Sequence, residues 1–303
     1  MDKKILEDHI DEINEIIYEF LPDADEYNAP LTEAVNYSIK AGGKRLRPML
    51  MLETFRLFSD TREIPEMLKI LMASIEFIHT HSLIHDDLPC IDNDDLRRGI
   101  TSTHKKFGEA LGVLSGDALL NYAYEIALRG IDESSDPEYY MCGISSLRVL
   151  SEKAGMYGML SGQSVDVYSE KNADFTVGEK ELGYIYKKKT AALFEAPMMI
   201  GAIFGGASDL EVKIMEKAAC YIGLAFQIRD DILDVTGNTE ELGKSTGSDD
   251  KNNKVTYVTY YGMEKAKSDV DKYMDAALNL IKQLKYKNSF LMEVLQLLSG
   301  RNK

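Results

Sequence analysis

Cysteine and positive charge are both scarce in this sequence. The three cysteines, Cys90, Cys142 and Cys220, are widely spaced and form no CxxC pair. That pattern argues against a disulfide framework or a zinc site and suits a reducing cytosol, so a cytoplasmic location is expected. Thirty-five basic residues stand against 50 acidic ones, giving a formal net charge of -15. A surface of this charge repels nucleic acid, so an anionic ligand needs a local basic patch or a bound metal.

Long hydrophobic runs are also missing. The first twenty residues are charged throughout and lack the apolar core of a signal peptide. The longest apolar region, residues 191–206, is interrupted by Glu195 and Pro197. It is too short and too broken for a membrane span, so we expect a buried helix there and no stable membrane span.

Proline is sparse, and helical periodicity dominates the rest. The last of the seven prolines is Pro197, and no Pro/Gly/Ser-rich linker separates one part of the chain from another. Apolar residues recur every three or four positions from Leu6 to Phe20, and few stretches alternate like a strand. Long helices are predicted over residues 67–88, 111–130, 147–163, 179–204, 210–235 and 263–284. The sequence therefore predicts an all-α fold, with residues 1–303 forming a single domain.

Two acidic motifs resemble each other. The sequence IHDDL occurs at residues 84–88, and the similar sequence IRDDI occurs at residues 228–232. Asp230 and Asp234 are four residues apart, which places both carboxylates on one face of a helix. An isolated motif of this kind is most often a solvated face, but its apolar neighbours indicate an inward-facing helix. Buried carboxylates need cations, and oxygen ligands without nearby His or Cys favour Mg²⁺.

The first motif needs a different geometry. Asp86 and Asp92 are six residues apart, and a continuous helix would place them on different faces. Pro89 lies between them and is expected to end the helix, so that the following loop folds Asp92 back beside Asp86. A calcium-binding loop is excluded, because a loop starting at Asp92 has Arg97 at the glycine position and Thr103 at the twelfth.

Three basic segments accompany the acidic motifs: GGKRLRP (42–48), YKKKTAAL (186–193) and LGKSTGSDDKNNK (242–254). Glycine lets the backbone approach an anion, and arginine offers a fork that matches phosphate oxygens. A P-loop is excluded, because Gly237 and Gly243 have five residues between them where that motif needs four. Each basic segment alone is typical of a solvated surface. Together with the acidic motifs they predict a site for diphosphates held through Mg²⁺.

These motifs resemble those of the trans-type isoprenyl diphosphate synthases, the polyprenyl synthetase family. The resemblance runs from Gly42 to Val258 and is strongest to the bacterial farnesyl diphosphate synthases. It rests on GGKRLRP, IHTHSLIHDDLPCIDNDDLRRG, HKKFGEALGVLSGDAL, GQSVD, KKKTAALFEAP, FQIRDDILD and LGKSTGSDDKNNKVTYV, in that order. It implies an isoprenoid-synthase helical bundle around a central active-site cavity, a homodimer, and three Mg²⁺ per site, with Mn²⁺ as an alternative.

The resemblance also implies roles for particular residues. The metal site would comprise Asp86, Asp92 and Asp230 as ligands, with Asp87, Asp231 and Asp234 supporting them. The allylic diphosphate would contact Arg97, Lys189, Thr190, Gln227, Lys244 and Lys254. Isopentenyl diphosphate would contact Lys44, Arg47, His79 and Arg98. The residues expected to be catalytic are Asp86, Asp92, Asp230, Arg97, Lys189 and Lys244.

The implied reaction is the head-to-tail condensation of isopentenyl diphosphate with dimethylallyl or geranyl diphosphate. Chain growth in the family is commonly limited five residues before the first motif, which is His81 here, with Ser82 beside it. A ring at that position favours farnesyl diphosphate, and geranylgeranyl diphosphate is the alternative product. A terpene cyclase, an HD-type phosphohydrolase and a non-catalytic subunit are less favoured. The chain carries two Asp-rich motifs, DDxxxxD at 86–92 and DDxxD at 230–234, and both are whole; it has only His9 before His79.

Overall fold

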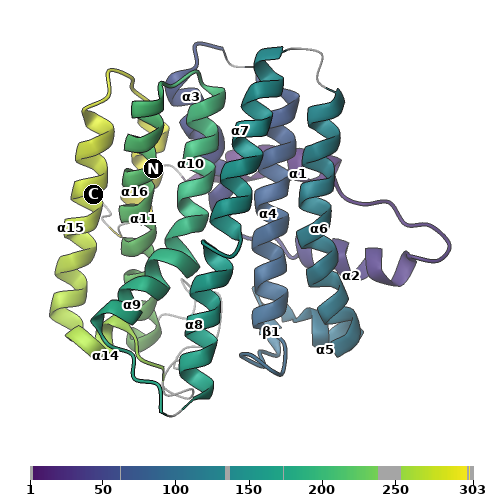
Figure 1. Ribbon diagram of the computed structural model, residues 1–303, viewed down its shortest axis with the longest axis vertical. Coiled ribbons are helices and arrows are strands. Elements are labelled where there is room, and N and C mark those ends of the chain that lie inside the picture. The colour runs from purple at the N-terminus through teal and green to yellow at the C-terminus, as the bar shows by residue number, and fades with distance from the viewer. Residues whose placement is uncertain are drawn as a thin grey trace. The chain divides into compact units, whose positions relative to one another are not determined.

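A computed structural model describes residues 3–61, 63–133, 137–172, 174–237, 254–298 and 300. The chain divides into two compact units. The N-terminal unit comprises residues 2–49 and 63–147, and the C-terminal unit comprises residue 1, residues 50–62 and residues 148–303. Helices make up nearly all of the regular structure in the described part, which confirms the predicted all-α class (Figure 1).

The N-terminal unit begins with α1 (Lys3–Glu19) and α2 (Ala29–Lys40). The remaining elements that lie in it or start in it are α3 (Leu46–Phe58), α4 (Glu66–Asp86), β1 (Leu96–Arg97), β2 (Ile100–Thr101), α5 (Thr103–Phe107), α6 (Glu109–Glu133) and α7 (Pro137–Ala154). Helices α3 and α7 start here and end in the C-terminal unit. The expectation that residues 1–303 are one domain stays a prediction.

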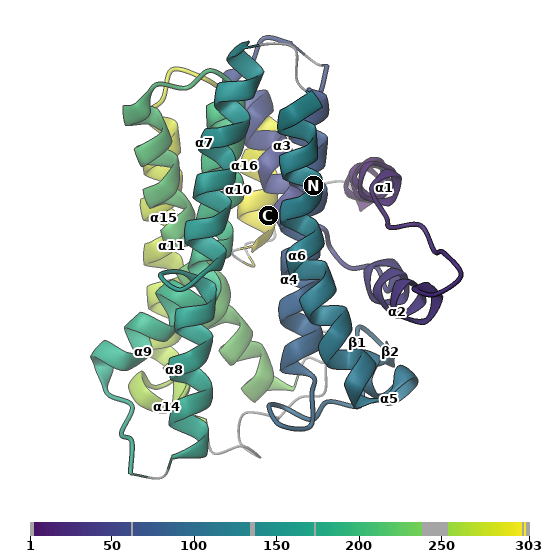
Figure 2. The ribbon, with the colours of Figure 1, turned by 45° about the vertical axis from the view of Figure 1, so that its right-hand side comes forward.

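Helices α4 and α6 lie side by side and form the centre of the N-terminal unit (Figure 2). The Phe77 and Tyr122 rings stack with centroids 6.0 Å apart, and the Ser74 hydroxyl donates to the Ala123 carbonyl at 2.9 Å. Gly130 allows a close approach, because a Cβ there would lie 2.4 Å from the Ile70 side chain. Helix α4 is long and apolar enough to cross a membrane, but 78% of that stretch is buried inside the protein. Such burial is typical of a core helix.

The C-terminal unit carries the helices from α8 onward. They are α8 (Met159–Lys171), α9 (Glu179–Ile185), the π-helix η1 (Tyr186–Ala191), α10 (Ala192–Phe204), α11 (Asp209–Thr236), α14 (Tyr257–Tyr261), α15 (Met263–Lys282) and α16 (Ser289–Leu298). Helix α11 packs against both α10 and α15, and the Phe194 and Phe226 rings meet at 5.1 Å. Ser208 and Glu211 form a capping box that begins α11.

Two helix predictions need correction. The helix expected over 147–163 is two helices, because the chain turns at residues 155–158 between α7 and α8. Gly158 makes that turn sterically feasible, since a Cβ there would lie 1.9 Å from the Lys153 carbonyl oxygen. The helix expected over 179–204 contains the π-turn η1 in its middle. Such turns arise where one extra residue is accommodated, and they often mark functional positions.

Candidate active site

The first acidic motif lies where α4 ends. Asp86 is the last residue of the helix, three positions before Pro89, as predicted. The Asp92 amide then donates to the Asp86 carbonyl at 2.9 Å, so the loop does fold Asp92 back beside Asp86. Asn93 takes a positive φ of 55°, which turns the chain after this contact. The two aspartates that the spacing separates are therefore brought together by the backbone.

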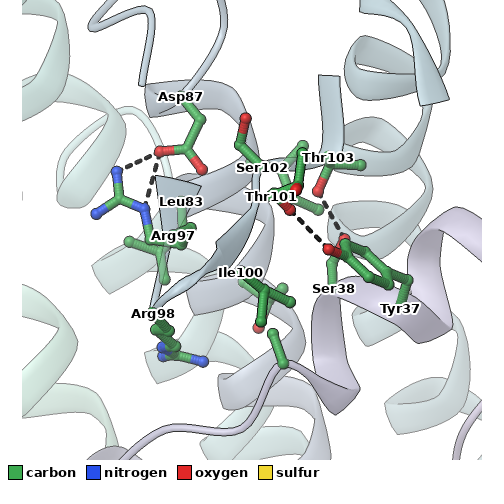
Figure 3. Close-up of a pocket in the computed structure, with 13 residues that line it drawn as sticks. Tyr37, Ser38, Leu83, Asp87, Arg97, Arg98, Ile100, Thr101, Ser102 and Thr103 are labelled. Carbon is green, nitrogen blue, oxygen red and sulfur yellow. Dashed lines mark hydrogen bonds and ion pairs between the residues drawn. The ribbon is translucent and has the colours of Figure 1, made fainter. Parts of the chain in front are cut away.

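Asp87 is held by arginine. Its side chain is almost completely buried, and the Arg97 Nε donates to its Oδ1 at 2.8 Å (Figure 3). A second Arg97 nitrogen contacts the same oxygen, and Arg97 also reaches Asp94 at 3.1 Å. Burial raises the pKa of Asp87 to about 6, although Arg97 opposes that shift. Arg97, expected at the diphosphate, is thus engaged by two carboxylates of its own loop.

The two arginines sit in a tight hairpin formed by β1 and β2. Arg98 and Gly99 occupy its turn with φ values of 54° and 80°, as a two-residue turn of this kind requires. The Tyr37 hydroxyl donates to the Thr101 carbonyl at 2.8 Å and ties the hairpin to α2 (Figure 3). The turn points Arg97 and Arg98 to different partners, since Arg98 donates to the Gly42 carbonyl.

GGKRLRP packs against that hairpin. Gly43 has a φ of 128°, and a Cβ there would lie 2.6 Å from the Arg98 guanidinium carbon. Arg45 is buried and pairs with Glu76 at 2.8 Å, which makes it a structural arginine. Lys44 is exposed, whereas burial lowers the pKa of Arg47 to about 10. The structure therefore gathers the predicted Lys44, Arg47 and Arg98 in one unit, with Arg45 supporting them.

His79 is surrounded by positive charge. Burial lowers its pKa well below the ordinary value, and four arginines lower it further: Arg47, Arg98, Arg97 and Arg45. The imidazole is consequently neutral at pH 7. A neutral ring donates one hydrogen bond without adding to the repulsion among the arginines.

His81 faces α6. It is 3% exposed, and its Nδ1 lies 3.0 Å from the Gly116 carbonyl oxygen. Its ring meets the His85 ring edge-on at 4.6 Å. Burial lowers the pKa of His81 to about 4, so this ring is also neutral at pH 7. Ser82 turns back into α4, where its hydroxyl donates to the His79 carbonyl at 2.8 Å.

The second acidic motif lies on the unbroken helix α11, so Asp230 and Asp234 share a face as predicted. Asp230 is partly exposed, whereas Asp231 and Asp234 are buried. The Asp231 carboxylate accepts hydrogen bonds from Gln227 at 3.1 Å and from the Tyr257 amide at 2.8 Å. The Thr190 hydroxyl donates to the side-chain amide oxygen Oε1 of Gln227 at 2.6 Å, which brings two predicted site residues together.

Lys189 and Lys254 converge on one carboxylate. Their Nζ atoms lie 2.5 Å and 2.8 Å from Asp166 Oδ2, and Lys254 also pairs with Glu170 at 3.0 Å. Burial alone would raise the pKa of Asp166, but the two lysines outweigh it and lower that pKa to about 2. Lys189 lies within η1, against which α8 packs closely at Gly162. Lys244 lies outside the described residues.

Asp166 is the residue that sequence reasoning missed. It is the aspartate of GQSVD, a motif that the resemblance includes without a role for any member. The presence of an acidic residue within this motif was the available signal. Its two lysine partners come from distant segments, so only the fold reveals them.

The donor chemistry fits Mg²⁺. Among the residues that the structure describes, no three His, Cys, Asp or Glu side chains gather into a ready-made metal cage. Mg²⁺ usually takes one or two protein carboxylates and completes its shell with water and substrate phosphates. Each acidic motif offers two carboxylates, Asp86 with Asp92 and Asp230 with Asp234, which matches that number. The residues present therefore suit a metal that arrives with a diphosphate.

Comparison with known proteins identifies the family of the chain. A family model described as "Polyprenyl synthetase" matches residues 28–295. The chain belongs to the polyprenyl synthetase family. A farnesyl diphosphate synthase of Geobacillus stearothermophilus is 39% identical over 90% of this chain and 89% of its own length. A chloroplastic geranylgeranyl pyrophosphate synthase of Catharanthus roseus is 45% identical over 79% of this chain and 65% of its own length.

Solved structures share the fold of this family. A geranyltransferase of Helicobacter pylori, crystallised with magnesium and isoprenyl diphosphate, superposes with a TM-score of 0.84. It is 30% identical and covers 98% of this chain and 96% of its own. A FPP/GFPP synthase of Zymomonas mobilis gives a TM-score of 0.81 at 32% identity, with the same coverage. The chain is therefore a trans-type prenyltransferase with the all-α fold of this family.

Proposed function

We propose that the protein condenses isopentenyl diphosphate with dimethylallyl and then geranyl diphosphate to give farnesyl diphosphate and free diphosphate. The observation that carries this proposal is the 2.9 Å contact of the Asp92 amide with the Asp86 carbonyl, immediately before the hairpin that bears Arg97 and Arg98. This short segment thus offers the carboxylates of Asp86 and Asp92 to a metal and the guanidinium groups of Arg97 and Arg98 to phosphate.

The acidic motifs are proposed to hold Mg²⁺ through Asp86 and Asp92 and through Asp230 and Asp234. When bound, the metal neutralises the allylic diphosphate and makes it a better leaving group. Lys189 and Lys254 provide further positive charge for the phosphate oxygens and are preorganised by Asp166. Thr190 and Gln227, already joined by a hydrogen bond, orient the same group.

Isopentenyl diphosphate is proposed to bind the cluster of Lys44, Arg47, His79 and Arg98. Lys44 is exposed, and the Arg98 guanidinium packs against Gly43, where a side chain would displace it. The neutral His79 donates a hydrogen bond without raising the charge of the cluster. After carbon–carbon bond formation, the proton lost from the adduct passes to the released diphosphate.

Product length is proposed to be set at His81, with Ser82 beside it. The buried His81 ring is fixed against Gly116 of α6, which makes it a rigid obstacle. The second candidate product is geranylgeranyl diphosphate, which the 45% identity to the Catharanthus roseus enzyme favours. Chromatography of the products formed from dimethylallyl and isopentenyl diphosphate decides between them, since C15 supports the proposal and C20 replaces it.

We also propose that the protein acts in the cytoplasm as a homodimer. Helix α6 carries three large exposed apolar side chains, Val113, Leu114 and Leu128, which suit contact with a second copy. Sedimentation at micromolar concentration tests this, because a monomer would contradict it.

A further inference from the structure

Asp231 differs from the other aspartates of the second motif. It is 3% exposed, and both of its oxygens accept hydrogen bonds from described donors. Gln227 donates to Oδ1, while the Tyr257 amide and the Tyr186 hydroxyl both donate to Oδ2. Tyr186 is itself buried at the start of η1. The carboxylate therefore joins three separate elements of the C-terminal unit.

Tyr186 and Tyr257 make this junction continuous. The Tyr257 amide lies 2.8 Å from the Tyr186 hydroxyl as well as 2.8 Å from Asp231. On the other side, the Tyr257 hydroxyl donates to Asp269 at 2.7 Å, and Asp269 pairs with Lys265 at 2.6 Å. The backbone at Tyr257 is thus anchored from α11 and its side chain from α15.

Lys254 lies three residues before this anchor. Its ammonium group reaches Asp166 at 2.8 Å and Glu170 at 3.0 Å. Three residues span at most about 10 Å, so fixing the Tyr257 backbone confines the space that Lys254 can sample. Losing the anchor would let the lysine move away from Lys189 and their shared partner.

We propose that Asp231 is a positioning residue and not a metal ligand. It fastens residues 254–257 to α11 through Tyr186, and so holds Lys254 beside Asp166 in the geometry that binds the allylic diphosphate. This inference rests on the proposed function of Lys254. A metal bond at Asp231 Oδ2 would compete with the hydrogen bonds that this oxygen accepts from the Tyr257 amide and the Tyr186 hydroxyl, and a metal bond at Oδ1 would compete with Gln227. It gives a specific role to an aspartate that the family resemblance counts only among the residues supporting the metal site.

The test compares Tyr186→Phe, Asp231→Asn and the double variant with Asp230→Asn as the matched control. Hydrogen exchange is measured first, in metal-free protein without substrate. Removing the Tyr186 hydroxyl or one Asp231 oxygen is expected to speed exchange of the Tyr257 amide about tenfold, and the double variant is expected to add little to either. Asp230→Asn is expected to leave that exchange unchanged.

Kinetics supply the second readout. For Tyr186→Phe and Asp231→Asn we expect a KM for the allylic diphosphate raised about tenfold, with an unchanged KM for isopentenyl diphosphate and an unchanged Mg²⁺ requirement. Asp230→Asn is expected to raise the Mg²⁺ requirement instead. The inference is overturned if Asp231→Asn shifts the Mg²⁺ requirement as Asp230→Asn does, or if Tyr257 exchange stays at the wild-type rate in Tyr186→Phe. Because exchange is measured without substrate, it remains decisive for the anchor even if the proposed reaction fails.

Discussion

Asp166 Oδ2 lies 2.5 Å from the Lys189 ammonium nitrogen and 2.8 Å from that of Lys254, so one buried carboxylate holds two lysines from distant segments. Two ammonium groups this close repel each other unless an anion lies between them. Asp166 supplies that anion in the absence of substrate. The pair is therefore assembled before a diphosphate arrives, and little reorganisation is needed on binding.

Replacing Asp166 by Asn should destabilise the protein in a pH-dependent way. The folded-state pKa of about 2 lies below the ordinary value of 3.8, so the ionised carboxylate stabilises the fold above pH 4. That contribution is roughly 2 kcal/mol and is lost as the pH falls towards 2. Urea denaturation should show a wild-type advantage over Asp166→Asn that is full at pH 7 and shrinks below pH 4.

Asp132→Asn is the control for that measurement, because Asp132 is exposed on α6 and belongs to no described ion pair in the structure. It should alter stability little at any pH. If the free energy of unfolding of Asp166→Asn stays below that of the wild type by a constant amount from pH 7 to pH 3, the charge of Asp166 is not the cause of the stabilisation.

Asp86→Asn and Asp92→Asn should each raise the Mg²⁺ concentration needed for half-maximal activity, by tenfold or more. Each removes one hard oxygen ligand from the pair that the Asp86–Asp92 backbone contact assembles. Asp95→Asn is the matched control from the same loop, since Asp95 is exposed and pairs with Lys105 at 2.8 Å. Equal Mg²⁺ requirements for all three variants would refute the assignment of the first motif.

Arg97→Gln should destabilise the metal-free protein at pH 7.5 by about 1–3 kcal/mol, because it leaves the buried Asp87 without its arginine. The pKa of Asp87 is raised from 3.8 to about 6 in the folded protein. Its contribution to the free energy of unfolding is therefore complete below pH 3.8 and is lost as the pH rises through about 6. The deficit should therefore shrink at pH 5. Adding Asp87→Asn should recover most of the loss, and denaturation curves showing additive losses instead would exclude this pairing.

His81→Ala should lengthen the product beyond that of the wild type. The substitution removes a buried ring that is held against Gly116, and so opens space beside α6. His81→Tyr keeps a ring and is the control that should not lengthen it. If chromatography shows products of the same chain length for His81→Ala and the wild type, His81 does not limit the length of the product.

The sequence predicted those parts of the site that depend on local rules. Pro89 ends α4, which predicts both the helix boundary and the return of Asp92 to Asp86, and both are confirmed. The shared face of Asp230 and Asp234 follows from helical spacing, and α11 is indeed unbroken there. Such features need only backbone geometry within a few residues.

Other features depend on tertiary contacts and could not be predicted in this way. Arg97 pairs with Asp87 and does not extend into solvent, and this depends on how the hairpin folds onto the end of α4. The π-turn at Lys189 has no local periodicity that distinguishes it from an α-helix. The break between α7 and α8 did have a signal in Gly155 and Gly158, but isolated glycines inside a helical pattern are often tolerated.

The most direct test of the central claim is diphosphate release by the purified protein under four conditions. These are dimethylallyl diphosphate alone, isopentenyl diphosphate alone, both together with Mg²⁺, and both with a chelator. The account expects release only with both substrates and Mg²⁺. Release from dimethylallyl diphosphate alone would indicate a cyclase or hydrolase, and no release under any condition would indicate a non-catalytic subunit. Either result would contradict the proposed condensation.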